Sequence, residues 1–391
     1  MFPLSNLSTK TPYLSSHFIT HPLPSTPPPP TCPTSPSSIH TLSRHGARHT
    51  GDIDGLNDLA ASLNSTWSTT YSYPVSPLYS NQLLDLGISE HEYIGEQIAA
   101  KYPDVFESYS PVTHNVTTTA LPRTGQSSVA QLRGVGVATP YVVMNGNTPK
   151  GADAVLRFYD DCGAWEDGKE VGGRVFEEYL ETEVVVEAVA RFNVVTGGQY
   201  VYADMATAVE GCVYDMILED VTDRFCSLLD QGVVDIVNYG VDLNKYYQYG
   251  PGGGDVVRDF TVMLVDDVVG SVERSLGGGG KGSLRFAHAE TLIPFLNVLG
   301  VFDDAEKLGT EIVEGRVFDM SVWAPFAGNV LLGVWECEGR VMVRIEVNGR
   351  EVSARGCGGE VWCEWETIKG ALVDVLDMVE GGLEGVCGGD M

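Results

Sequence analysis

A histidine stands between two arginines in the segment Arg44-His45-Gly46-Ala47-Arg48. Guanidinium groups hold phosphate oxygens in a planar, bidentate way, and an imidazole can accept a phosphoryl group as a covalent phosphohistidine. The intervening glycine lets the backbone approach a ligand closely. The segment therefore has the side chains of a phosphate pocket with His45 as nucleophile, although five residues alone fit a surface segment that binds nothing equally well.

Two further segments add the groups that phosphomonoester hydrolysis needs. Arg123 precedes a stretch with helical apolar spacing, so we expect it at a helix start, which itself attracts anions. The segment from His288 to Glu290 places a second imidazole and a carboxyl group where a predicted strand gives way to a predicted helix. Glu290 could protonate the leaving alcohol and later activate water. The three segments together predict a phosphatase.

The predicted elements place these segments at strand ends. The range 38–43 is predicted to be a buried strand that ends at Arg44, and 283–287 a second strand that ends before His288. Open α/β sheets bind their ligands at such strand ends. The other predicted elements are helices over 83–101 and 290–299, and strands over 141–144, 330–335 and 341–347.

The middle of the chain differs in character from its two ends. Long acidic and apolar stretches between 171 and 247 have helical spacing, which predicts a helical insert. Its glutamates, Glu177, Glu178, Glu181, Glu183 and Glu187, are expected on a solvated helix face. We predict an α/β core formed by 38–134 and 255–391, a helical insert over 135–254, and an extended proline-rich segment over 1–37.

The charge of the chain limits its partners. Fifty-three acidic and 24 basic side chains give a formal charge of −29, which argues against nucleic acid and anionic membranes. A polyanionic substrate would have to meet the few arginines gathered at one place, around His45. No apolar run is long enough to cross a bilayer, and no complete nucleotide or zinc motif is present, so we expect an enzyme without a cofactor.

Two features indicate an oxidising compartment. Three glycosylation sequons begin at Asn6, Asn64 and Asn115, although such triplets also arise by chance. Eight cysteines lack a paired zinc spacing and suit disulfides, with ordinary buried thiols as the alternative. Cys212 with Cys226, and Cys357 with Cys363, are the candidate pairs. We expect a secreted or secretory-lumen protein whose signal peptide is missing from this sequence.

The order of these motifs resembles branch two of the histidine phosphatases, which includes the histidine acid phosphatases and phytases. The His-Ala-Glu form resembles the multiple inositol-polyphosphate phosphatase subgroup. Other segments agree over nearly the whole chain: 9–13, 156–160, 242–247 and 325–329. The family usually has proline where Thr50 stands, a departure that removes no catalytic group.

The resemblance implies an α/β core with a mostly helical insert, and the hydrolysis of phytate and lower inositol phosphates. It implies these roles: His45 as phosphorylated nucleophile, Glu290 as proton donor, and Arg44, Arg48, Arg123 and His288 as phosphate-binding residues. Lys245 and Lys281 are expected to be solvated, with contact to outer phosphates as the alternative. The glycine-rich loops near 252 and 277 are expected at the rim of the site. A broad acid or bisphosphoglycerate phosphatase, and an inactive acidic extracellular binding protein, remain alternative functions.

Overall fold

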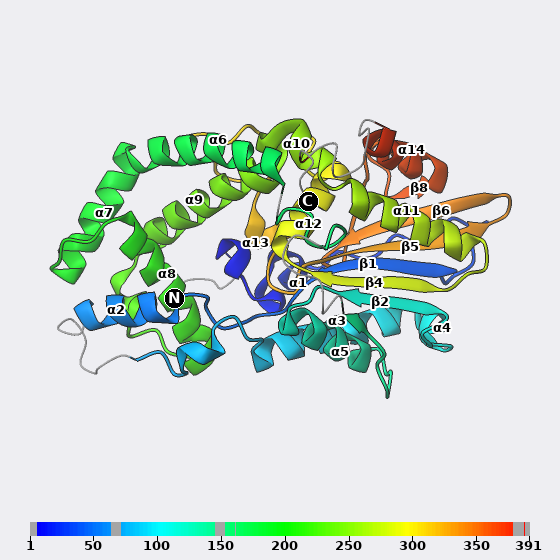
Figure 1. The fold of residues 1–391 in the computed structure, drawn as a ribbon, viewed down its shortest axis with the longest axis horizontal. Helices are drawn as coiled ribbons and strands as arrows, with labels where there is room; N and C mark the ends of the chain where they lie inside the picture. Colours follow the sequence, from blue (N-terminus) through cyan, green and yellow to red (C-terminus); the bar gives the residue numbers. More distant parts are fainter. Residues whose placement is uncertain (1–5, 64–71, 145–152, 161, 378–386, 388–391) are drawn as a thin grey trace.

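The computed structural model describes residues 6–63, 72–144, 153–160, 162–377 and 387. The sequon at Asn64 lies outside these residues. A central sheet with the strand order β3-β2-β4-β1-β5-β6-β7, in which β8 pairs beside β6, runs through one half of the molecule (Figure 1). The strands are β1 (Ser38–Arg44), β2 (His114–Thr118), β3 (Val143–Met144), β4 (Gly282–Ala287), β5 (Asn329–Cys337), β6 (Arg340–Val347), β7 (Arg350–Val352) and β8 (Trp362–Glu364).

The sheet has a parallel part and an antiparallel part. Strands β1 to β4 pair in parallel with one another, whereas β5 is antiparallel to both β1 and β6. Strand β1 is buried along its whole length, because it lies in the middle of a sheet covered on both faces. The α/β core predicted from the sequence is confirmed.

Helices cover both faces of the sheet (Figure 1). On one face α3 (Asp85–Lys101), α4 (Pro103–Phe106) and α5 (Pro122–Gly134) lie together, and on the other α11 (Val262–Leu276) packs against α14 (Trp365–Asp377). Helix α12 (Ala289–Val298) follows β4. The remaining short helices are α1 (His17–Thr20), α10 (Gly254–Asp259), α13 (Met320–Trp323) and the 3-10 turns Ser8–Lys10, Tyr13–Ser15, Pro77–Tyr79, Phe225–Leu228 and Pro251–Gly253.

A helical lobe lies beside the sheet (Figure 1). It contains α6 (Gly163–Leu180), α7 (Glu183–Thr196), α8 (Tyr202–Glu219) and α9 (Gln231–Tyr249), in agreement with the predicted helical character, and its predicted acidic face is exposed. Helix α2 (Ile53–Leu63) packs against α8 and so lies with this lobe, while β3 pairs with β2 in the core sheet. The range 135–254 therefore includes one core strand before the helices of the lobe begin.

The amino-terminal segment is not extended throughout, so the prediction for 1–37 is wrong over its first half. Residues 8–20 form short turns and a helix, with Ser8, Thr9 and Thr11 buried. The carbonyl of Thr11 accepts a hydrogen bond from the Phe326 amide at 2.9 Å. The segment is thus held by residues more than 200 positions away, which its own composition cannot reveal.

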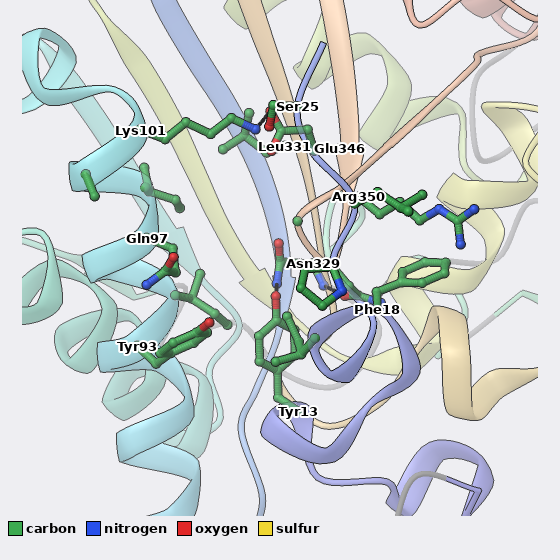
Figure 2. Close-up of a pocket in the computed structure, with 18 of the residues that line it drawn as sticks. Tyr13, Phe18, Ser25, Tyr93, Gln97, Lys101, Asn329, Leu331, Glu346 and Arg350 are labelled. Carbon is green, nitrogen blue, oxygen red and sulfur yellow. Dashed lines mark hydrogen bonds and ion pairs between the residues drawn. The ribbon is translucent and has the colours of Figure 1, made fainter.

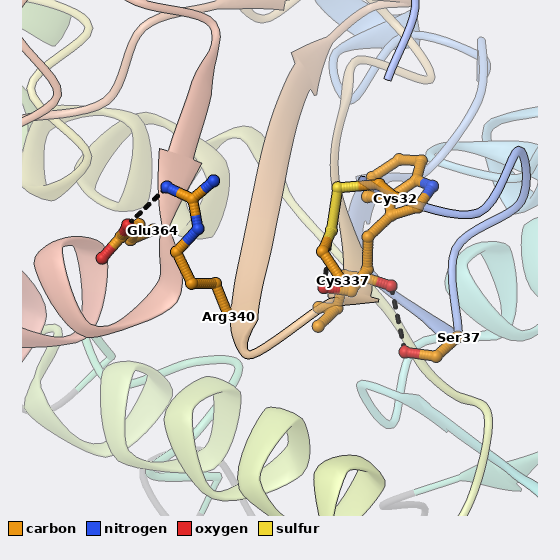
Figure 3. Close-up of a disulfide and its surroundings, with 7 residues drawn as sticks. Cys32, Ser37, Cys337, Arg340 and Glu364 are labelled. Carbon is orange, nitrogen blue, oxygen red and sulfur yellow. Dashed lines mark hydrogen bonds and ion pairs between the residues drawn. A yellow bond between two sulfur atoms is a disulfide. The ribbon is translucent and has the colours of Figure 1, made fainter. Parts of the chain in front are cut away.

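The proline-rich part, 21–37, has neither helix nor strand and is fastened by a disulfide. Cys32 is bonded to Cys337 at the end of β5, and the Ser37 hydroxyl donates to the Val334 carbonyl at 3.1 Å (Figure 3).

Both predicted pairs, Cys212–Cys226 and Cys357–Cys363, are present. The fourth disulfide joins Cys162 to Cys387, so no cysteine is free. In the described part of the chain, no helix is long and apolar enough to cross a membrane.

Candidate active site

The parallel strands bring the three predicted segments to one edge of the sheet. Arg44 is opposite Ala287 in the β1–β4 ladder, and Thr118 is opposite Phe286 in the β2–β4 ladder. Because parallel strands end at the same edge, the residues that follow them are neighbours. The rings of His45 and His288 have their centroids 5.4 Å apart.

A cavity of about 570 Å³ opens at this edge, and all six residues proposed from the sequence line it. Its other lining residues come from the amino-terminal segment, the 157–169 region and α9: Thr9, Lys10, Arg157, Tyr159, Asp160, Trp165, Glu166, Lys169, Lys245, Tyr249 and Ala289. The whole lining contains seven of the chain's 24 Lys and Arg residues and three acidic side chains. The cavity is therefore cationic in a strongly anionic protein.

A second cavity of about 640 Å³ lies between the amino-terminal segment, α3 and the sheet. Figure 2 shows Tyr13 directed toward Asn329, whose side-chain amide donates to the tyrosine hydroxyl at 3.1 Å. The charged groups that line this second cavity include Lys101, which is paired with Glu346 at 2.8 Å. None of the six proposed residues lines it, so the smaller cavity is the candidate site.

The ring of His45 is oriented by its own loop. Its Nδ1 lies 2.9 Å from the Gly46 carbonyl oxygen, which can only accept, so Nδ1 carries the proton and Nε2 has the free electron pair. Burial, reinforced by the neighbouring Arg44 charge, lowers the pKa of His45 well below its ordinary value. The imidazole is thus neutral, as attack on phosphorus requires.

Three arginines line the same cavity. Arg44 directs Nη1 to the carbonyls of Thr9 at 2.6 Å and Ala324 at 2.8 Å, which fixes its position. In the described structure the Nε atoms of Arg44, Arg48 and Arg123 are buried without a hydrogen-bond partner. The three arginines line the cavity, and an anion bound there would accept hydrogen bonds from their guanidinium groups. Arg123 lies in the first turn of α5, as predicted.

His288 has neighbours that the sequence did not identify. Its Nε2 lies 3.1 Å from the Thr119 hydroxyl and 3.4 Å from Nη1 of Arg157. Two hydrogen bonds from Arg157 to Asp160, at 2.5 and 2.9 Å, hold that guanidinium in place. Since a guanidinium can only donate, Nε2 of His288 is unprotonated. Burial, with Arg123 nearby, lowers the pKa of His288 well below its ordinary value.

Glu290, in the first turn of α12, is paired with Lys245 of α9 at 3.0 Å. Burial alone would raise the pKa of Glu290, but the Lys245 charge holds that pKa well below its usual range. His288 contributes less than its proximity suggests, because burial keeps it neutral. The carboxyl group is therefore ionised in the free enzyme. Lys245 is not a solvated lysine, since only 19% of its side chain is exposed.

The loop that carries His45 is held by α3 and α5. Glu90 accepts hydrogen bonds from the Ala47 amide at 2.7 Å and the Tyr13 amide at 2.6 Å. Its neighbour His91 lies 3.1 Å from the Arg44 carbonyl and donates to it. A side chain at Gly46 would collide with the backbone of α3, which explains the glycine at this position.

The unusual Thr50 has a partner in the helical lobe. Its hydroxyl donates to Glu210 at 2.7 Å, and the same carboxylate is paired with Lys10 at 2.5 Å. A proline at position 50 could not make this contact. The segments 9–13 and 156–160 each contribute a cation to the cavity, Lys10 and Arg157 respectively.

Two expectations about the rim of the site are corrected. Lys281 and the glycines at 277–280 precede β4, whereas His288 follows it, so they lie at the opposite end of that strand. The other loop, 250–254, is not among the residues that line the cavity; the tyrosine just before it, Tyr249, is. Glycine runs mark turns, but they do not tell at which end of a strand the turn lies.

Comparison with known proteins agrees with this geometry. Residues 37–348 match the family model described as "Histidine phosphatase superfamily (branch 2)". Proteins named multiple inositol polyphosphate phosphatase 1 are similar: the Gallus gallus protein is 24% identical over 78% of this chain and 72% of its own length, and the Dictyostelium discoideum protein is 25% identical over 87% and 66%. The chain thus spans about two thirds to three quarters of these relatives.

Solved structures share the fold. The phytase from D. castellii superposes with a TM-score of 0.75 at 18% identity, covering 99% of this chain and 87% of that one. The Bifidobacterium longum multiple inositol polyphosphate phosphatase in complex with inositol hexasulfate gives 0.67 at 15% identity, covering 95% and 97%. The family model covers most of the chain and includes both histidine segments, so this protein belongs to branch 2 of the histidine phosphatase superfamily.

Proposed function

We propose that this chain hydrolyses phosphomonoesters of inositol polyphosphates through a phosphohistidine intermediate on His45. The observation that carries the proposal is the cavity itself, in which a neutral, oriented imidazole stands among three arginines. Most of the work in phosphoryl transfer is positioning and charge stabilisation, and this pocket offers both.

The proposed reaction has two steps. Nε2 of His45 attacks phosphorus while Arg44, Arg48 and Arg123 hold the equatorial oxygens, and Glu290 gives a proton to the departing alcohol oxygen. In the second step Glu290 takes a proton from water, which attacks the phosphohistidine and releases inorganic phosphate. His288 stands beside the phosphoryl group as a neutral ring.

The charge of the cavity supports a polyphosphorylated substrate. A single phosphate needs the three arginines near His45, yet Lys10, Arg157, Lys169 and Lys245 also line the cavity. Four further cations suit a substrate that carries more than one phosphate. The relatives named multiple inositol polyphosphate phosphatase and the neighbouring structure with inositol hexasulfate support inositol polyphosphates as that class.

The test compares phosphate release from phytate with release from monoesters such as glycerol 2-phosphate and glucose 6-phosphate. We expect a higher kcat/KM for phytate, no turnover after His45→Ala, and slow turnover with nearly unchanged binding after Glu290→Gln. Equal or faster hydrolysis of the monoesters would favour the broad acid phosphatase reading. Full activity of His45→Ala would refute the mechanism.

The compartment is a second part of the proposal. Four disulfides join all eight cysteines, as is typical of secreted and secretory-lumen proteins. We therefore place the enzyme outside the cytosol. The Asn115 sequon is available for glycosylation, since this residue is exposed on β2. A mass shift of the Asn115 peptide on deglycosylation of the natively expressed protein tests this assignment.

A further inference from the structure

We propose that Lys245 couples the general acid Glu290 to the presence of a second phosphate on the substrate. In the free enzyme this lysine is bound to the carboxylate of Glu290, and a phosphate next to the scissile one draws it away. Glu290 then takes up a proton from solvent and donates it to the leaving oxygen as the phosphorus–oxygen bond breaks and the bond to Nε2 of His45 forms. This inference rests on the proposed function.

The geometry places both partners on the wall of the same cavity. Lys245 Nζ lies 3.0 Å from Oε1 of Glu290, and the two side chains are 19% and 31% exposed. Lys245 comes from α9 of the helical lobe, whereas Glu290 comes from α12 beside the sheet. The pair thus joins the two parts of the molecule at the cavity wall, where both side chains are accessible to a substrate.

The chemistry of the substrate brings a competitor to this pair. Glu290 must approach the leaving oxygen to protonate it. In a fully phosphorylated inositol, both carbons next to the one that bears this oxygen carry phosphates. A phosphate dianion carries more charge and more acceptor oxygens than a carboxylate, so it competes effectively for the ammonium group of Lys245. Its negative charge also favours the protonated form of Glu290.

The other groups that face Glu290 do not replace Lys245 in this role. Arg44 and Arg123 lie within electrostatic range of Glu290, but in the proposed mechanism they hold the phosphate that is being transferred. Tyr159 and Tyr249 are kept neutral because burial raises the pKa of each. His288 is neutral as well. Lys245 is thus the cation whose partner can change between the free and the substrate-bound enzyme.

The consequence is a form of specificity that depends on protonation. A monoester with one phosphate does not disrupt the ion pair between Lys245 and Glu290. Glu290 therefore stays ionised, and the rate of hydrolysis falls already at low pH. A polyphosphate removes the lysine and restores the acid. The enzyme therefore prefers polyphosphates partly through the rate of the first step and not only through affinity.

The experiment measures kcat/KM against pH for three substrates with the unaltered enzyme and Lys245→Met. Glycerol 2-phosphate has one phosphate and needs an acid, whereas p-nitrophenyl phosphate departs as a stable anion and does not. For glycerol 2-phosphate we expect the alkaline limb of the kcat/KM profile to lie at least about one pH unit higher in Lys245→Met than in the unaltered enzyme. At a pH above this limb, the difference corresponds to about tenfold in kcat/KM. The limb for p-nitrophenyl phosphate should stay in place, and the KM for phytate should rise.

Lys169→Met is the matched control. Lys169 lines the same cavity but is paired with Glu166 at 2.5 Å, so its loss removes the same charge without touching Glu290. We expect no movement of the limb in this variant, and restoration of the original limb in Lys245→Arg. Circular dichroism verifies that each variant is folded.

An unmoved limb in folded Lys245→Met, or an equal movement in Lys169→Met, would overturn the inference while leaving the proposed function intact if phytate is still hydrolysed. Failure of the unaltered enzyme to release phosphate from phytate would refute the proposed function and this inference with it. The two failures are therefore distinguishable.

Discussion

Glu90 is a buried titratable group that holds the loop carrying His45, so the stability of the protein should depend on its protonation. Its carboxyl group is fully buried and accepts the amide hydrogens of Tyr13 and Ala47. Burial raises its pKa from an ordinary 4.5 to about 7, against the opposing effect of these two hydrogen bonds. Because the pKa of Glu90 is higher in the folded than in the unfolded state, Glu90 contributes to the free energy of unfolding below pH 4.5. This contribution is lost as the pH rises through 7. The loss corresponds to about 3 kcal/mol.

The variant Glu90→Gln keeps the shape of the side chain and cannot ionise. It leaves one of the two amides without an acceptor, which costs about 1–3 kcal/mol at any pH. We expect the unfolding free energy of the unaltered protein to exceed that of the variant most at pH 4.5, and this advantage to shrink by about 3 kcal/mol by pH 7.5. Urea denaturation with the disulfides intact measures both curves. An advantage that is constant over this range within about 0.5 kcal/mol would refute the reasoning.

Two further predictions concern phosphate binding and the disulfides. Arg123→Lys keeps the charge but loses the fork-shaped donor, so kcat/KM for phytate should fall about a hundredfold, and steady-state kinetics showing less than a threefold change would remove Arg123 from the site. Replacing Cys162 and Cys387 together with alanine should lower the unfolding free energy by about 2–5 kcal/mol in urea, because the bridge closes a separation of 225 residues, and unchanged stability would contradict this role.

The parts of the fold that the sequence predicted well depend on local patterns. The run before Arg44 contains Ile39 and Leu42, and the strand before His288 has Leu284 and Phe286 in alternation; parallel pairing then brings the ends of the two strands together. The short strand β2 was missed, since its sequence is mostly polar. Thr119, which follows β2 and contacts His288, was missed for the same reason.

The rest of the site depends on contacts between distant residues. Ser8 is buried, and its hydroxyl donates to Asp242 at 2.6 Å, a partner 234 positions away. Lys245 has the appearance of a surface lysine on a helix, and only the fold shows that Glu290 is next to it. Local propensity carries no information about such pairs, so the amino-terminal segment and the cations of the helical lobe could not be assigned from sequence.

The proposed nucleophile is tested most directly by trapping the intermediate. The enzyme is mixed with phytate, quenched within milliseconds in alkaline denaturant, and digested for mass spectrometry under conditions that preserve phosphohistidine. The account predicts a phosphorylated peptide whose modified residue is His45, formed before phosphate accumulates and absent in His45→Ala. A phosphoryl group on another residue, or phytate hydrolysis at the normal rate by His45→Ala, would contradict it.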